Sequence, residues 1–176
     1  MSTQPQFQAA AVVYRANEHD RLALADFARE LAAAGYQVGG VVQEVFHDEQ
    51  GRRIRIDSVD LATGERVTIN QANRGGPDDP ACTLDTAALT DSGAPLRRVL
   101  IDRPDMVVVE KFGEQEQNAA GLMDEILGII SEGLPILVLV PEAALASWRE
   151  LTGGVTAEVP CEIEALRHWW QAQRHT

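Results

Sequence analysis

A glutamate and the only lysine of the chain come directly after a short apolar run in the middle of the sequence. The run is Asp105–Val109 (DMVVV), Glu110 and Lys111 come next, and Gly113 and Glu116 lie in the polar stretch that continues from them. A carboxylate at this point can act as a base or hold a metal ion, and a lysine can bind an anion such as a phosphate. The residue types therefore make Glu110 the candidate catalytic residue and the other three candidate ligand-binding residues.

A structural role is the alternative for the same side chains. Glu110 could form an ion pair with an arginine such as Arg52 or Arg53, and Lys111 could be an exposed loop cation. The functional interpretation depends on where Glu110 lies in the fold. If the apolar run is a strand of a parallel sheet, Glu110 lies at its carboxyl end, where open α/β sheets bind their ligands.

A second polar stretch, Arg15–Asp20 (RANEHD), separates the first apolar run from a helical pattern. Arg15 could contact a phosphate, His19 could donate a hydrogen bond to one, and Asn17 has the residue type of a helix cap. These three residues are candidate ligand-binding residues. The simpler interpretation is a solvated loop that caps the helix.

Cys82 lies in a segment, Asn73–Thr83, whose glycines, prolines and aspartates predict a loop. A reactive or metal-binding thiol there would need a lowered pKa or partner ligands, for which His47 is a candidate. A structural cysteine is the alternative. Because Cys161 is the only other cysteine, the sequence predicts neither a disulfide framework nor a zinc site.

Short apolar runs alternate with helical patterns over most of the chain. Runs such as Pro135–Val140 (PILVLV) are typical of strands that are buried on both faces of a parallel sheet. Arg53–Asp60 and Glu65–Asn70 alternate between apolar and polar residues, which predicts an antiparallel hairpin. Gly39 and Gly40 indicate a bulge or a close backbone approach. The expected strands are 9–14, 36–45, 105–110, 135–140 and 155–159, and the expected helices are 18–34, 84–100 (irregular near 92–95), 122–131, 141–151 and 162–174.

These elements predict an α/β fold, a three-layer sandwich with a mostly parallel sheet that the 53–70 hairpin extends at one edge. Of two adjacent tryptophans on the last helix, Trp169 and Trp170, we expect one in the core and one partly exposed. Without an internal repeat or a linker, the chain is expected to form one domain, 1–176, with an ordered core of about 8–172. The expected core residues include Val107, Val109, Ile136, Leu137, Val138 and Leu139.

Composition excludes several classes of protein. The 176 residues are 45% hydrophobic and 24% charged, as in ordinary globular domains. A net charge of −12 disfavours binding to nucleic acid or to an anionic membrane surface. No apolar run reaches the roughly 18–20 residues that span a bilayer. The first eight residues, MSTQPQFQ, do not resemble a secretory signal, so we expect a cytoplasmic location.

Two segments carry a resemblance to a known family. Gly35–Arg66 (GYQVGGVVQEVFHDEQGRRIRIDSVDLATGER) and Asp105–Glu116 (DMVVVEKFGEQE) resemble parts of the small thermophilic nucleoside-triphosphatase family, the second of them its Walker B strand and the loop after it. That resemblance implies a P-loop-NTPase-like fold. It places Glu110 on the Walker B acid, Lys111 on the next acid, and Gly113 and Glu116 on matching loop positions.

A closer resemblance is to a bacterial family of P-loop-NTPase-like proteins without an assigned activity. It shares the hairpin, Cys82 followed by Leu84 and Asp85, a KFG after the central strand, and the C-terminal tryptophan pair, so that it covers nearly all of Ala9–Trp170. Members are sometimes labelled as molybdenum-transport ATP-binding proteins and often occur with molybdenum or nitrogen-fixation functions. The resemblance implies a ligand or partner from that physiology.

The segment that would bind a triphosphate in a P-loop protein, here Arg15–Asp20, lacks the residues that this binding requires. A phosphate-binding P-loop uses glycine backbone N–H groups, a lysine, and a serine or threonine that binds Mg²⁺. Arg15–Asp20 contains none of these residue types, and the lysine is far away at position 111. Glu18 and Asp20 would instead repel an anion at the start of the helix. We therefore do not expect hydrolysis of ATP or GTP by the usual route.

Three functions are compatible with these observations. The preferred one is a degenerate P-loop-fold protein that binds a small anion, a nucleotide or a partner protein without hydrolysis. The second is a nucleoside triphosphatase that uses Arg15 and Lys111 as cations and Glu110 as base or metal ligand. The third is a scaffold that forms homo-oligomers through its terminal helix or a sheet edge. The sequence identifies no cofactor.

Overall fold

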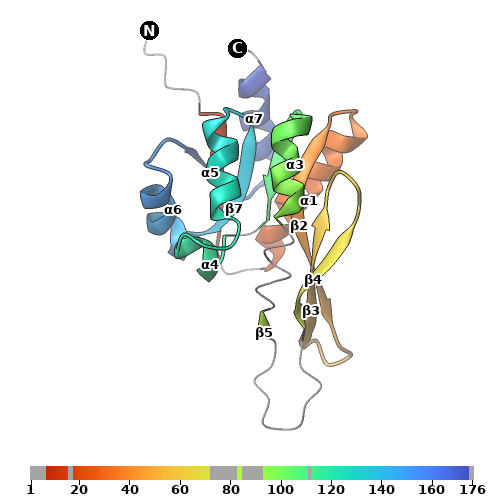
Figure 1. Cartoon of the computed structure of the whole chain (residues 1–176). Helices are drawn as coiled ribbons and strands as arrows, with labels where there is room; N and C mark the ends of the chain where they lie inside the picture. Colours follow the sequence, from red (N-terminus) through yellow and green to blue (C-terminus); the bar gives the residue numbers. More distant parts are fainter. Residues whose placement is uncertain (1–6, 16–17, 72–82, 85–92, 111, 175–176) are drawn as a thin grey trace.

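A computed structural model of the chain describes residues 7–15, 18–71, 83–84, 93–110 and 112–174. One sheet of eight strands, in the order β5-β4-β3-β2-β6-β7-β1-β8, runs through it (Figure 1). The strands are β1 (Ala9–Tyr14), β2 (Val38–His47), β3 (Arg53–Asp60), β4 (Arg66–Gln71), β5 (Thr83–Leu84), β6 (Met106–Val109), β7 (Ile136–Pro141) and β8 (Ala157–Pro160). The helices are α1 (Glu18–Ala33), α3 (Ala94–Asp102), α4 (Glu114–Gln117), α5 (Met123–Ser131), the 3₁₀ turn η1 (Glu142–Ala144), α6 (Leu145–Leu151) and α7 (Ile163–Arg174).

Five neighbouring strands, β2, β6, β7, β1 and β8, are parallel. Both faces of this parallel sheet are buried, since alternate side chains of β6 and β7 point into two different cores. Val107 and Val138 pack with residues of α3, α5 and α6, whereas Val108 and Leu137 pack with residues of α1 and α7. The structure thus confirms the three-layer α/β sandwich, and all six expected core residues are buried.

The antiparallel extension is an arm formed by β2, β3, β4 and β5. The first part of β2, Val38–Val41, pairs with β6, while its second part continues beyond the parallel sheet and pairs with β3. Figure 1 shows this arm projecting past the end of the parallel strands. The predicted hairpin is therefore confirmed, and the arm overhangs the carboxyl edge of the sheet.

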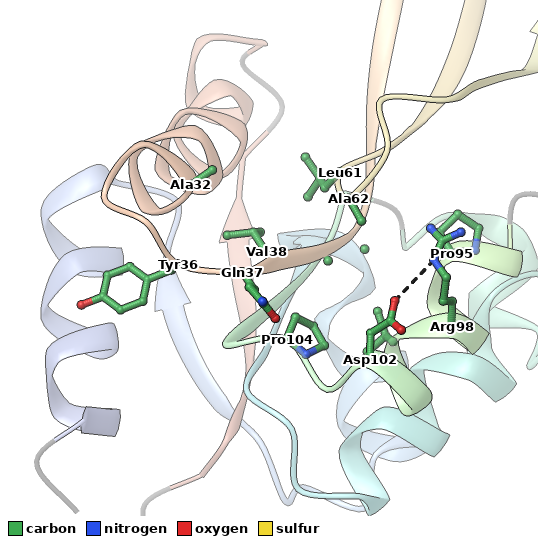
Figure 2. A pocket seen from close by; sticks show the side chains of 13 residues that line it. Ala32, Tyr36, Gln37, Val38, Leu61, Ala62, Pro95, Arg98, Asp102 and Pro104 are labelled. Carbon is green, nitrogen blue, oxygen red and sulfur yellow. Dashed lines mark ion pairs between the residues drawn. The ribbon is translucent and has the colours of Figure 1, made fainter.

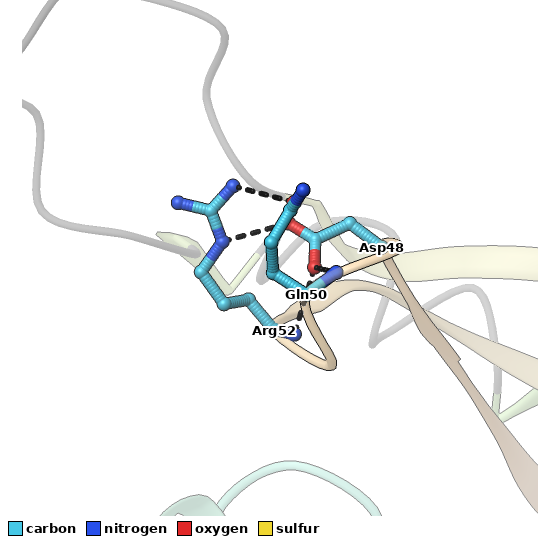
Figure 3. Close-up of polar contacts among 3 residues, drawn as sticks. All are labelled: Asp48, Gln50 and Arg52. Atoms are coloured by element: carbon cyan, nitrogen blue, oxygen red, sulfur yellow. Dashed lines mark hydrogen bonds and ion pairs between the residues drawn. The ribbon is translucent and has the colours of Figure 1, made fainter.

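The tip of the arm is a turn that is closed by one aspartate (Figure 3). Asp48 Oδ1 accepts hydrogen bonds from the backbone N–H groups of Gln50 and Arg52, at 3.0 and 2.9 Å, and Oδ2 accepts one from Arg52 Nε at 2.7 Å. The hydrogen bond from the Arg52 N–H is the main cause that lowers the pKa of this carboxyl. Arg52, one of the two arginines expected near Glu110, is thus paired within its own turn.

Gly40 explains the glycine pair inside β2. Its φ of +107° lies in the region that favours glycine, and a Cβ at this position would overlap the carbonyl oxygen of Val108 on the neighbouring strand. The predicted close backbone approach is therefore confirmed. Gly40 thus lies near the end of the stretch of β2 that pairs with β6.

Three expectations about local structure are wrong. Leu84, expected to begin a helix, lies in β5, and α3 begins at Ala94 because Pro95 suits the first turn of a helix. Pro141 ends β7 instead of opening a helix, and η1 precedes α6. Trp169 and Trp170 are both buried, because α7 packs on α1 while Tyr36 covers Trp170 with an edge-on ring contact at 5.4 Å.

Candidate functional site at the carboxyl edge of the sheet

A cleft of about 390 Å³ lies where the arm meets the carboxyl ends of the parallel strands. Tyr14 of β1 and Glu110, which follows β6, contribute to its lining from the sheet, Arg53 from the arm, Arg21 from α1 and Gly113 from the loop before α4. Residues from distant parts of the sequence meet here because parallel strands end at one edge. The cleft is therefore the place in the fold where a ligand is expected.

Glu110 is a buried acid within this cleft. Only 6% of Glu110 is exposed, and Glu110 Oε2 accepts a hydrogen bond from the backbone N–H of Gln43 at 3.0 Å. Burial raises the pKa of the Glu110 carboxyl to about 7, although the Gln43 N–H and the charges of Arg21 and Arg29 act in the opposite direction. Near neutral pH this side chain can therefore give or take a proton.

Arg21 is the cationic side chain that the sequence did not single out. Its Nε is buried and has no hydrogen-bond partner among the described residues, and no ion pair joins the guanidinium to a described carboxylate. The guanidinium lies over the ring of Tyr14, 5.3 Å from the ring centre. A buried arginine Nε without an acceptor is unusual, because burial of a polar group is costly unless the group is hydrogen-bonded. The arrangement suits an anion from solution.

The spacing of residues in α1 is the sequence signal that could have identified Arg21. Arg21 precedes Leu24 and Ala28 by three and seven residues, and these positions share one face of a helix. Leu24 and Ala28 are buried against the sheet. A charged residue on the buried stripe of a helix is a candidate for function.

The arm brings a second arginine to the cleft. Arg53 opens β3 and lines the same space as Arg21 and Glu110. The cleft is therefore lined by two arginines and by two glutamates, Glu110 and Glu114. Gln43 and apolar residues such as Phe112 and Ile69 complete the lining. This combination can bind an anionic group by charge-assisted hydrogen bonds.

Glu116 positions the loop and does not line the cleft. The side chain is fully buried, Oε2 accepts the Gly113 N–H at 2.8 Å, and Oε1 accepts the Leu122 N–H at 3.1 Å. Gly121 has a φ of +60°, and a Cβ there would overlap Glu116 Oε1. The Glu116 carboxylate thereby ties the loop that carries Gly113 to the start of α5.

The structure does not bring all predicted site residues together. Arg15 is exposed and forms an ion pair with Glu142 at 3.3 Å, in a separate cleft on the β8 side of β1. Asn17, Lys111, Cys82 and the side chain of His19 lie outside the part of the chain that the structure describes. Of the predicted residues with described side chains or backbone, Glu110 and Gly113 face the candidate site.

A cavity of about 560 Å³ lies at the opposite end of the sheet, between α1 and α3 (Figure 2). Tyr36, Val38 and Pro104 line it, together with Arg98. Arg98 pairs with the buried Asp60 and with Asp102, and the pairing with Asp60 is the main cause that raises the pKa of its guanidinium. The charge of Arg98 is thus already compensated by two ion pairs, whereas Arg21 forms none with the described carboxylates.

Among the residues that the structure describes, no group of three or more histidine, cysteine, aspartate or glutamate side chains could hold a metal ion. Within the same part of the chain, no helix is both long and apolar enough to cross a membrane.

The parallel sheet with helices on both faces defines a three-layer α/β protein, consistent with a P-loop-like fold. The chain belongs to the family described as "Protein of unknown function (DUF2478)", whose model matches residues 9–169. It is 36% identical over 162 residues to the molybdenum import ATP-binding protein ModC 2 of Bradyrhizobium diazoefficiens. That match covers 92% of this chain but only 18% of the relative's length. No solved structure gives a significant match.

Proposed function

We propose that the carboxyl-edge cleft binds an anionic group, a phosphate or a comparable oxyanion, free or as part of a nucleotide, and does not hydrolyse it. The observation that carries the proposal is Arg21, a guanidinium whose buried Nε has no hydrogen-bond partner among the described residues. Arg53 and the Glu110 carboxyl line the same space. An oxyanion would supply the acceptor oxygens that Arg21 lacks.

The absence of hydrolysis follows from the sequence of the first loop. Phosphoryl transfer depends on positioning and on stabilisation of charge by a phosphate loop and Mg²⁺. Arg15–Asp20 has no glycine, lysine, serine or threonine and carries two acids. Arg15 pairs with Glu142 in the neighbouring cleft, so it supplies no cation beside Glu110. Binding without turnover is therefore the function that these residues support best.

The name of the relative agrees with this class of ligand. ModC 2 is named as an ATP-binding protein of molybdenum import, and both ATP and molybdate are oxyanions. Because this chain spans about a fifth of that protein, the name does not determine which ligand the chain takes. We infer a distant relationship to ATP-binding proteins in which an anion site is kept and the phosphate loop is degenerate, and a role in molybdenum physiology.

Calorimetric titration tests the proposal. Phosphate, molybdate, ADP and ATP are titrated into the full chain at pH 7, with and without Mg²⁺. We expect at least one of them to bind, and Arg21→Gln to weaken that binding by about tenfold or more. Arg97→Gln is the matched control, since Arg97 is an exposed arginine of α3 that pairs with Glu125.

Two results would overturn the proposal. One is the absence of binding by every anion. The other is binding that Arg15→Gln abolishes and Arg21→Gln leaves intact, because the ligand would then occupy the neighbouring cleft beside Glu142. Phosphate release from ATP or GTP above background, lost in Glu110→Gln, would replace the non-hydrolytic function with the triphosphatase that the sequence left as an alternative.

A further inference from the structure

We propose that Glu110 makes the cleft select oxyanions that carry a proton, such as hydrogen phosphate, over fully ionised oxyanions such as sulfate and molybdate. This inference rests on the proposed function and names the ligand class of the same site. It assigns Glu110 as the residue that determines specificity, and Arg21 and Arg53 as the residues that supply attraction for any anion.

The geometry leaves one oxygen of Glu110 for a ligand. Oε2 accepts the Gln43 N–H, and Oε1 has no hydrogen-bond partner among the described residues. The side chain is buried at the floor of the cleft and cannot turn into bulk water without leaving its backbone donor. A ligand that is held by Arg21 therefore also meets a carboxyl oxygen.

Whether the Glu110 carboxylate attracts or repels the oxyanion depends on whether the oxyanion carries a proton. An ionised carboxylate only accepts hydrogen bonds, and so does an oxyanion without protons. Two acceptors that face each other in a site of low polarity repel, and the desolvated oxygens stay unsatisfied. A proton on the oxyanion turns the same contact into a charge-assisted hydrogen bond, with the ligand as donor and Glu110 as acceptor.

The charged groups around Glu110 come from several elements. Arg21 and Arg29 belong to α1, Arg53 to β3 and Glu114 to the start of α4, and Arg29 is itself paired with Asp26. With a pKa of about 7, the Glu110 carboxyl is mostly ionised near pH 8 and mostly protonated near pH 6. In the protonated form it can donate, so a fully ionised oxyanion gains affinity as the pH falls.

Titration of phosphate, sulfate and molybdate at about pH 8 and at about pH 6 tests the selection. At pH 8 we expect the wild-type chain to bind phosphate about tenfold or more tightly than sulfate or molybdate. At pH 6 this preference should shrink. Glu110→Gln should lose most of the preference at pH 8, because an amide can both donate and accept. Glu150→Gln, at an exposed position of α6 outside the cleft, is the matched control and should keep it.

The outcomes separate this inference from the proposed function. If no anion binds at either pH, the proposed function fails and the inference fails with it. If all three anions bind equally at pH 8, or if the preference for phosphate persists in Glu110→Gln, the selection by Glu110 is wrong while the anion site stands. Tighter binding of molybdate than of phosphate at pH 8 would also overturn it.

Discussion

Replacing Glu110 by glutamine should make the folded chain more resistant to rising pH. A glutamate whose pKa is raised by folding contributes most stability when it is protonated in both states, below its ordinary pKa of about 4.5. That contribution is lost as the pH rises through the folded pKa of about 7, because the unfolded chain ionises first. Glutamine cannot ionise, so the Glu110→Gln variant does not lose this stability as the pH rises.

The magnitude follows from the difference between the two pKa values. At about 1.4 kcal/mol per pH unit, values of about 7 and 4.5 correspond to about 3 kcal/mol over the whole range. Of this, about 2 kcal/mol falls between about pH 5.5 and pH 8.5, a window that stays above the sequence pI of about 4.7. Only 6% of Glu110 is exposed, so solvent screening does little to reduce the effect.

Urea denaturation of both proteins across that window measures the effect, since all other titrating groups cancel in the difference. The stability of Glu110→Gln relative to wild type should grow by about 2 kcal/mol from pH 5.5 to pH 8.5. A flat difference for Glu110→Gln, or one that shrinks with rising pH, would refute the reasoning that burial controls this carboxyl.

Further predictions concern the elements that shape the cleft. Gly40→Ala should lower the free energy of unfolding by about 3 kcal/mol or more, because its Cβ would overlap the Val108 carbonyl; Gly35→Ala, at a φ of +93° with open space around it, should lower it by only about 1 kcal/mol in the same urea titrations. Glu116→Ala should cost about 2–3 kcal/mol by leaving the Gly113 and Leu122 N–H groups without their acceptor, whereas Glu114→Ala should change little; equal thermal melts for the two would contradict the structural role of Glu116. Trp148→Phe should cost about 1–2 kcal/mol through loss of the hydrogen bond from its Nε1 to Thr156, and an unchanged melting temperature would speak against that bond.

The parallel half of the fold could be predicted because its strands are nearly continuous apolar runs. MVVV and ILVLV allow no amphipathic alternative, and they were placed to within one or two residues. The arm was predictable from alternation and turn residues. Leu84 was placed wrongly because a two-residue strand gives no periodic signal, and its pairing with β4 comes from tertiary structure alone.

The candidate site could be predicted only in part. Glu110 was recognisable because it follows a buried strand directly. Arg21 was not, since a single arginine near the start of a helix is usually solvated, and only the fold shows that its Nε is buried. Arg15 precedes the same helix, yet it turns to the other side of β1 and pairs with Glu142. Which way a side chain turns at a sheet edge depends on its neighbours in space, and the local sequence does not determine it.

A crystal structure with bound arsenate at about pH 8 tests the central claim most directly. Arsenate carries a proton as phosphate does, and its arsenic atom can be located by anomalous scattering. The account predicts an arsenic peak in the carboxyl-edge cleft, with its oxygens within hydrogen-bond distance of Arg21 and Glu110, and no such peak in Arg21→Gln. An arsenic peak beside Arg15 and Glu142, or a cleft that stays free of arsenate in crystals where Arg21 is open to solvent, would contradict it.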